Sequence, residues 1–320
     1  MPRGLVVSKD PLIVLSSINH DAPLGVISML PNLFRGKKSL HFLSPAWSLV
    51  GGFAELRKKI SECRITFPEA QFVVLANEEI ELAQLQMNGL LTILANPSVF
   101  IDEQIFKPKP DRLVKFDAVY NAVFKKFKNH DLCADVSSLM LIYYDNHVIE
   151  HDDEKYVDHI RRTLKHAIFQ NEIQPSGYHY MSPIEISDAL NQCHTGLCLS
   201  AAEGTMRVCV ETLLCGIPVV SIAARGGRMR YLNELNSRIV PADAASVAYA
   251  VQELKRLNIN ADLIRNDILS VLRFERRNFL NSANIFIAAF LGTEKLISDF
   301  SIFKSSLNYL TALEWAKALS

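Results

Sequence analysis

Short apolar runs alternate with amphipathic runs along most of the chain. The runs at 39–44, 71–77 and 90–96 are apolar without alternation, which is typical of strands with both faces buried. The segments between them, 53–63 and 78–89, read as amphipathic helices. This order of elements predicts a parallel sheet covered by helices on both faces, and therefore an α/β fold.

A break in the alternation indicates a domain boundary. Segment 106–112, FKPKPDR, holds two prolines and little apolar surface, which is typical of a linker. The alternation then restarts, with strands expected at 117–123, 139–144, 196–200, 217–223 and 237–241, and helices at 129–138, 153–171, 182–194, 228–236 and 243–257. The sequence predicts domains over 1–110 and 111–290, with helices over 291–320 that pack back towards the first domain.

The composition is that of a soluble globular protein. Of 320 residues, 49% are hydrophobic and 21% charged, and the formal net charge is zero, which gives no general attraction to nucleic acid or an anionic membrane. The six cysteines form no C-x-x-C pair, so we expect buried, reduced thiols in a cytoplasmic chain. No apolar run reaches the ~18 residues that cross a bilayer. Peripheral contact with the inner face of the membrane stays open.

The segment 197–221, LCLSAAEGTMRVCVETLLCGIPVVS, suggests a phosphate site at the end of a strand. Thr205 is a candidate N-cap for a helix over about 206–215. The N-terminus of a helix that follows a parallel strand offers free N–H groups and partial positive charge to a phosphate. Gly204 would let that phosphate approach the backbone, and Met206 would follow it into the helix.

Two glutamates flank this predicted helix start. Glu203 precedes the helix and Glu211 lies nearly two turns within it, so their carboxylates would lie roughly 10 Å apart. That layout matches a ligand with hydroxyls at both ends and phosphates between, such as a nucleotide-activated sugar. The spacing alone equally fits a solvated loop residue and a locally paired acid. Because the neighbours of Glu211 are apolar, we expect its carboxylate to have a partner.

The segment SAAEGTMRVCVETLLCGIPVVSIAARGG resembles the E-x7-E segment of retaining glycosyltransferases of the GT-B fold, of the family-4 type. The matching positions, in order, are Ser200, Glu203, Gly204, Glu211, Gly216, Pro218, Val219, Val220, Gly226 and Gly227. The resemblance implies two Rossmann-like domains that face a cleft. It also implies that Glu203 contacts the transferred sugar, that the backbone of 204–206 and the amides of Gly226 and Gly227 lie at the donor, and that Glu211 binds the ribose.

The basic segment 120–132, YNAVFKKFKNHDL, resembles the family's diphosphate-gripping segment in part. Lys128 stands where the family has a lysine that holds the diphosphate. Asn121 and Ala122 replace the family's Gly-Arg pair, and Lys125 or Lys126 is a candidate substitute for the arginine. A solvated loop is the alternative interpretation of this segment. Further on, Arg225, Arg228 and Arg230 could add charge near the glycine pair.

The first domain departs more from the family, since it spans only about 105 residues. Gly51 and Gly52 precede a predicted helix, as the family's glycine pair does, although an ordinary loop-to-helix junction is the alternative. The resemblance also implies a catalytic histidine in this domain. We prefer His20, beside Asp21, over His41, with a surface or core histidine as the alternative.

Together these features predict a retaining glycosyltransferase of the hexosyltransferase kind, which moves a sugar from a nucleotide-diphosphate-sugar to an acceptor glycan, lipid or protein. The resemblance implies no metal and no cofactor beyond this donor, and the histidine- and acid-rich stretch 144–159 is interpreted as a solvated loop entering a helix. The alternatives are a non-catalytic nucleotide-sugar-binding partner of a glycosyltransferase, a nucleotide-sugar epimerase of the same fold, and an α/β protein unrelated to sugars.

Overall fold

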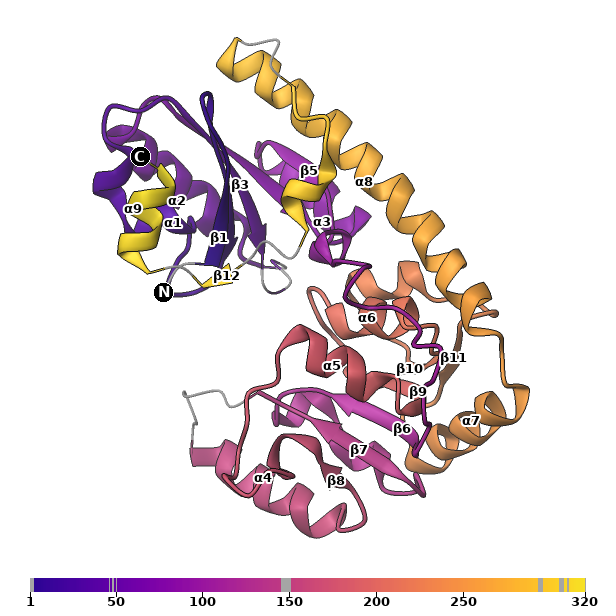
Figure 1. The fold of residues 1–320 in the computed structure, drawn as a ribbon. Coiled ribbons are helices and arrows are strands. Elements are labelled where there is room, and N and C mark those ends of the chain that lie inside the picture. The colour runs from indigo at the N-terminus through magenta and orange to yellow at the C-terminus, as the bar shows by residue number, and fades with distance from the viewer. Residues whose placement is uncertain are drawn as a thin grey trace. The chain divides into compact units, whose positions relative to one another are not determined.

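The computed structural model describes residues 3–45, 47, 49, 51–144, 151–292, 296–304, 308–309 and 311–319. The chain forms two compact units (Figure 1). Unit 1 comprises 1–101 and 272–320, and unit 2 comprises 102–271. These divisions lie at 101/102 and 271/272, whereas the sequence analysis placed them at 110/111 and 290/291, because one long helix begins in unit 2 and ends in unit 1.

Unit 1 is built on a six-stranded sheet in the order β12-β1-β2-β3-β4-β5, in which β2 to β5 are parallel and β1 is antiparallel to both neighbours. Its strands are β1 (Arg3–Lys9), β2 (Leu12–Ile18), β3 (Ser39–Pro45), β4 (Ala70–Ala76), β5 (Thr92–Leu94) and β12 (Asn308–Tyr309). Its helices are α1 (Val26–Met29), α2 (Phe53–Thr66), α3 (Glu79–Met87), α9 (Ala312–Leu319) and most of α8 (Ala261–Leu291).

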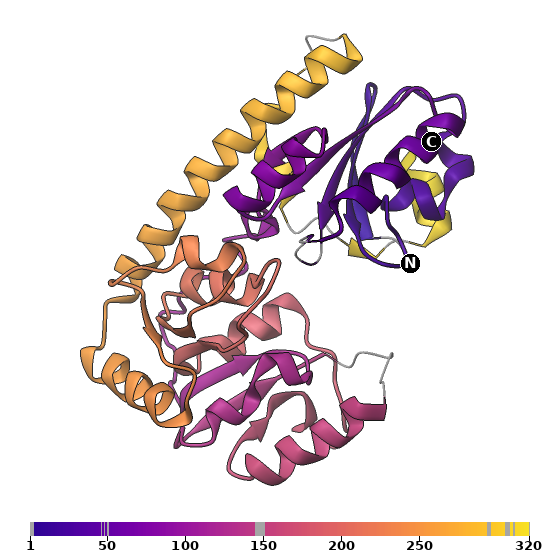
Figure 2. The ribbon, with the colours of Figure 1, turned by 180° about the vertical axis from the view of Figure 1, so that it is seen from behind.

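Both faces of this sheet are buried, as the unalternating apolar runs predict. Leu12 and Val14 belong to one core cluster, with residues of α1, α2, α3 and α9. Ile13 and Leu15 point to the other face, where Phe279 of α8 packs. Figures 1 and 2 show α8 along the face of the sheet opposite α2. The C-terminal end of α8 contributes the buried residues Ala283 and Ile287 to this face.

Unit 2 contains a fully parallel sheet in the order β11-β10-β9-β6-β7-β8. Its strands are β6 (Phe116–Asn121), β7 (Leu139–Ile142), β8 (Ile168–Phe169), β9 (Cys193–Cys198), β10 (Val219–Ile222) and β11 (Ser237–Val240). Its helices are α4 (His151–Thr163), α5 (Pro183–Leu190), α6 (Arg207–Leu214), α7 (Ala244–Leu257) and the start of α8. This is the strand order of a doubly wound fold, and its order reverses between β6 and β9, where such folds bind ligands.

Capping chemistry explains where two helices of unit 2 begin. Ser182 and Glu185 form a reciprocal capping box at α5, and Pro183 takes the first helical position. Asp243 accepts a hydrogen bond from Ser246 N at the start of α7. Both starts confirm the helix positions predicted from the sequence.

Four predicted helices of unit 2 are wrong in type or length. The helix expected at 182–194 ends at Leu190, and its last two predicted residues begin β9. The helix expected at 129–138 is a pair of 3-10 turns, η3 (Lys126–Lys128) and η4 (His130–Cys133), because Asn129 between them has a left-handed φ of 55°. The helix expected at 228–236 is the 3-10 turn η6 (Gly227–Tyr231). The helix expected at 153–171 ends at Thr163, and its later residues form the short strand β8 and the start of the 3-10 turn η5 (Gln170–Glu172).

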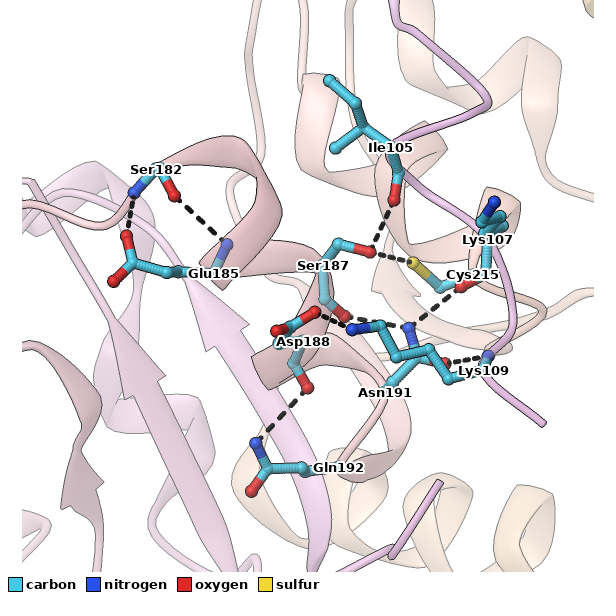
Figure 3. A network of polar contacts seen from close by, with 10 residues as sticks. All are labelled: Ile105, Lys107, Lys109, Ser182, Glu185, Ser187, Asp188, Asn191, Gln192 and Cys215. Carbon is cyan, nitrogen blue, oxygen red and sulfur yellow. Dashed lines mark hydrogen bonds and ion pairs between the residues drawn. The ribbon is translucent and has the colours of Figure 1, made fainter. Parts of the chain in front are cut away.

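The predicted linker lies against unit 2. Asn191 donates from Nδ2 to Lys107 O at 3.0 Å and accepts from Lys109 N at 3.0 Å, and Ser187 Oγ donates to Ile105 O at 2.8 Å (Figure 3). Arg265 of α8 donates to Phe106 O from the other side at 2.7 Å. The segment after residue 101 is therefore held by side-chain bonds along its length. Within the described part of the chain, no helix is both long and apolar enough to cross a membrane.

Candidate functional site

The candidate site lies at the carboxyl ends of β6, β9 and β10, where the strand order of unit 2 reverses. Lys128 follows β6 on η3, Glu203 follows β9, and Gly226 and Gly227 follow β10. These residues are separated by up to about a hundred positions in the sequence, and the parallel sheet brings their loops to one edge.

Lys128 and Glu203 form a buried ion pair between Nζ and Oε1. Both residues are 8% exposed. Nζ also lies 5.1 Å from the centre of the Phe127 ring, and Tyr120 donates its hydroxyl proton to the carbonyl oxygen of Lys128. Bringing two charges out of water is costly, so each depends on the other for compensation.

Asn129 joins the loop after β6 to the end of β9. Its Nδ2 donates to Leu199 O at 2.9 Å, and its positive φ turns the chain directly after Lys128. The next residue, His130, is buried among Tyr120, Phe124 and Tyr156. Burial lowers the pKa of His130 to about 3, so the ring beside Lys128 is neutral at pH 7.

The loops after β9 and β10 are fastened to each other through their backbones. Glu203 N donates to Arg225 O at 3.1 Å, and Arg225 N donates to Ala201 O at 3.0 Å. Gly226 has a φ of 108°, and a Cβ atom there would lie 1.6 Å from Glu203 O. The structure therefore requires a glycine at 226 for close packing of the two loops, a reason that the sequence analysis did not consider.

Arg228 is buried inside these two loops. Its guanidinium donates to Ser200 O at 2.6 Å, to Ser200 Oγ at 3.0 Å, to Ser221 Oγ at 3.2 Å and to Ile222 O at 3.2 Å. The expectation that Arg228 supplies charge to a ligand is therefore wrong, because its donors are already directed at the ends of β9 and β10. Arg225, by contrast, is exposed.

The helix α6 begins one residue later than predicted. Its N-cap is Met206, whose side chain makes no capping hydrogen bond. Thr205 is therefore not the N-cap, because the chain at Met206 has not yet adopted helical angles (φ −99°, ψ 78°). Gly204 is buried beside Glu203, and Gly227 N approaches Gly204 O at 3.5 Å. The predicted residues 204–206 thus lie between the ion pair and the start of α6.

Glu211 has the partner that its apolar surroundings led us to expect. Its Oε1 lies 3.6 Å from Arg207 Nε, one helical turn earlier. Burial raises the pKa of Glu211, and the adjacent Arg207 opposes that rise. The i,i+4 spacing of Arg207 and Glu211 is visible in the sequence, yet the sequence analysis assigned no role to Arg207.

The other predicted site residues lie in different places. Lys125 is half-buried at the start of η3, on the same loop as Lys128. His20 is exposed in unit 1, with Nδ1 3.4 Å from Asp21 Oδ1. Gly51 and Gly52 also belong to unit 1, and Gly52 is the N-cap of α2. The alternative at His41 is a core residue hydrogen-bonded to Ser39 Oγ at 2.9 Å.

In the part of the chain that the structure describes, no group of three or more His, Cys, Asp or Glu side chains is placed to hold a metal ion. Of the stretch 144–159, residues 145–150 lie outside the described residues. His159, near its end, lies 2.6 Å from Asp131 on η4. The described cysteines are free thiols, five of the six buried, which agrees with the sequence analysis.

Comparison with known proteins identifies the fold. No protein-family model and no curated protein sequence matches the chain. Among solved structures, sucrose-phosphate synthase from Thermosynechococcus elongatus aligns with a TM-score of 0.60 at 15% identity, over 83% of this chain and 71% of that one. HepE from Anabaena in complex with UDP aligns at 0.55 and 17%, over 80% and 72%. AviGT4, a glycosyltransferase involved in avilamycin A biosynthesis, aligns at 0.52 and 14%, over 84% and 79%. Two units with parallel sheets and these similarities show that the chain has the GT-B fold of glycosyltransferases.

Proposed function

We propose that this chain is a glycosyltransferase that moves a sugar from a nucleotide-diphosphate-sugar to an acceptor hydroxyl, with retention of configuration and without a metal ion. In this proposal Lys128 and the N-terminus of α6 bind the diphosphate, Glu203 binds the hydroxyls of the transferred sugar, and Glu211 binds the ribose. The acceptor is a glycan, a lipid or a protein.

The observation that carries the proposal is the buried Lys128–Glu203 pair at the switch point of the sheet. A lysine and a glutamate from strands that meet there offer opposite charges within one small volume. A nucleotide-sugar presents complementary groups side by side, since its phosphates are anionic and its sugar hydroxyls donate hydrogen bonds. The donor can therefore replace each side chain as the partner of the other.

The same residues favour the transfer step. The bond from the anomeric carbon to the diphosphate breaks, a bond to the acceptor oxygen forms on the same face, and the acceptor proton leaves with the diphosphate. Negative charge grows on the diphosphate as the sugar becomes oxocarbenium-like. In this proposal Lys128 and the first turn of α6 stabilise that charge, and fixed donors in a buried site do so without reorganisation.

The structural neighbours support the same assignment. One of the HepE structures was solved with UDP, and AviGT4 is described as a glycosyltransferase. Their fold places a ligand site at the carboxyl ends of parallel strands, which is where the ion pair lies in this chain.

Binding and turnover can be tested in sequence. A thermal-shift panel of UDP-, GDP-, ADP- and dTDP-sugars in EDTA should raise the melting temperature with one nucleotide, since ligand at 100 times its Kd adds about 2.7 kcal/mol of stability. The sugar of the stabilising donor should then be transferred to an acceptor in the presence of EDTA. NMR of the product gives the anomeric configuration of the transferred sugar. An unshifted melting temperature across the panel contradicts donor binding, an inverted product contradicts retention, and turnover that needs added metal contradicts the metal-free chemistry.

One alternative rests on a specific departure at the site. Asn121 and Ala122 replace the Gly-Arg pair of the resembling family, and Ala122 is buried with its N–H donated to Ile142 O at 2.9 Å. A chain without this arginine could bind a nucleotide-sugar and act as the non-catalytic partner of another transferase. Saturable nucleotide-sugar binding without transfer, hydrolysis or epimerisation would establish that alternative. Epimer formation without acceptor would instead identify an epimerase.

A further inference from the structure

A pocket of about 240 Å³ lies in unit 1, at the carboxyl ends of β2 and β3. Six apolar residues line it: Ile18, Pro23, Pro45, Trp47, Leu49 and Leu56. Ile18 and Leu56 are buried, whereas Trp47 is 51% exposed, so an indole ring at the pocket is accessible to solvent. Apolar pockets at this edge of an open α/β sheet are places where small ligands bind.

One cation and one carboxylate of the pocket lining are paired with each other. Lys59 and Glu55 lie on α2 one turn apart, 3.6 Å from nitrogen to oxygen, and the carboxylate of Asp21 lies beside His20. A phosphate would have to compete with Glu55 for Lys59. The pocket therefore fits an uncharged ligand with hydroxyls near its rim better than an anion.

The pocket wall is fixed from behind by a buried carboxylate. Glu81 of α3 is 1% exposed, and it accepts from Leu49 N at 2.7 Å through Oε1 and from Asn77 N at 2.6 Å through Oε2. Leu49 is thereby tied to the end of β4 across 32 positions of sequence. A wall held in this way is pre-formed, which lowers the entropy lost when a ligand enters.

We infer that this pocket receives the apolar part of an uncharged amphipathic acceptor, such as an alkyl or aryl glycoside, an inference that rests on the proposed function for the word acceptor. The volume is below the range of about 300–1,000 Å³ for drug-sized ligands, so it accommodates one ring or a short alkyl segment. The hydroxyl-bearing part then lies at the rim, near His20 and Asn19.

Binding can be measured without any donor. The chain has two tryptophans, and Trp315 is fully buried in the core, so a ligand in the pocket changes the emission of Trp47. We expect saturable changes with octyl β-D-glucoside below its micelle-forming concentration or with phenyl β-D-glucoside, and none with methyl β-D-glucoside at the same concentration. Octyl alone identifies an alkyl chain as the occupant, and phenyl alone identifies a ring. Equal affinity for all three would overturn the inference.

Substitutions locate the site. Trp47→Ala, followed by calorimetry, should weaken binding of the preferred glucoside about tenfold, as expected for an aromatic anchor. Ile65→Ala is the matched control, because Ile65 is an 83% exposed apolar residue at the far end of α2. Unchanged affinity in Trp47→Ala, or an equal loss in both variants, would overturn the inference.

Transfer assays separate this inference from the proposed function. If the hydrophobic glucoside binds at Trp47 and no nucleotide-sugar is turned over, the pocket stands and glycosyl transfer fails. If the sugar of the donor is transferred equally well to octyl and methyl glucoside, glycosyl transfer stands and the acceptor inference fails.

Discussion

Both units are built on parallel strands, but the residues at the carboxyl ends of these strands differ in chemical character between the units. In unit 2 the strand ends carry buried charges, namely the Lys128–Glu203 pair and the guanidinium of Arg228. In unit 1 the corresponding edge is an apolar pocket in which Lys59 and Glu55 pair with each other. In the two proposals above, the edge of unit 2 receives a charged donor and the edge of unit 1 receives an uncharged acceptor.

Both units nevertheless bury a carboxylate near the edge, and the partners differ. Glu81 in unit 1 is bound by two backbone amides, which a ligand cannot replace. Glu203 in unit 2 is bound by a lysine side chain, which a ligand can replace. The amide bonds of Glu81 hold a loop in place. The Lys128–Glu203 pair leaves two charges able to exchange partners, and burying these charges costs free energy of desolvation. Burial alone therefore does not distinguish the two acids, whereas the kind of partner does, and the proposed function assigns a ligand only to Glu203.

The largest effect is expected from breaking the ion pair of unit 2. Lys128→Met should reduce the free energy of unfolding of unit 2 by about 3–5 kcal/mol, because Glu203 is left buried without compensation. Glu203→Gln should reduce the free energy of unfolding by a similar amount, because Lys128 is then left buried without compensation. The double variant should recover most of the loss, and all three should lose donor turnover. Urea unfolding followed by circular dichroism measures the stability term, and the double-mutant cycle gives the coupling.

Lys109→Met supplies the matched control. Lys109 pairs with Asp188 of α5, also in unit 2, and the two side chains are 45% and 47% exposed. An exposed pair contributes about 0–1 kcal/mol. Both tryptophans belong to unit 1, so their emission provides an internal reference for the Lys128 variants. A cycle whose double variant is no more stable than the worse single variant would contradict the dependence of each charge on the other.

A smaller effect is expected in unit 1 from Glu81→Gln. A glutamine has one accepting oxygen, so either Leu49 N or Asn77 N is left buried beside an amide donor, at a cost of about 1–3 kcal/mol. Tryptophan emission should show the earlier unfolding of unit 1, and octyl glucoside should bind more weakly because Leu49 is less firmly held. Glu55→Gln is the control, since Glu55 is exposed on α2 and pairs only with Lys59 among the ion pairs described. A loss of stability as large in Glu55→Gln would refute a special role for Glu81.

The sequence predicts the elements whose signals are local. The apolar runs predicted β3 and β4, and the signals at Ser182 and Asp243 predicted the starts of α5 and α7. The prediction was wrong where a single backbone angle determines the element. Asn129, with its left-handed φ, interrupts the helix predicted at 129–138. The strands β1 and β12 were also missed. The edge strand β12 has two residues and pairs with β1 about 300 positions away, so no local pattern predicts it, whereas β1 also pairs with its neighbour β2 in an antiparallel hairpin.

The site was predictable in its members but not in its contacts. Lys128 and Glu203 were chosen for separate roles, and the bond between them spans 75 positions, which no local pattern reveals. Glu81 lies in the helix predicted at 78–89 and was given no role, because nothing near it in the sequence indicates Leu49 as its partner. Gly226 was chosen for its amide, whereas the structure adds a packing reason that needs the loop of Glu203 beside it.

The smallest effect is expected at Glu211, and it has the opposite sign. Burial raises the pKa of Glu211 above the usual value of 4.5, so the folded chain holds this proton more tightly than the unfolded chain. The resulting stabilisation is present below about pH 4.5 and is lost as the pH rises through the folded pKa. Glu211→Gln should therefore increase the free energy of unfolding at pH 7 by less than about 1 kcal/mol. It should also reduce the difference in this free energy between pH 5 and pH 7. Urea midpoints by circular dichroism at both pH values measure this, with nucleotide affinity measured in parallel, where we expect a loss because the ribose loses a charged acceptor. If Glu211→Gln is instead less stable than the parent at pH 7, pairing with Arg207 outweighs burial, and Glu211 belongs with the structural acids such as Glu81.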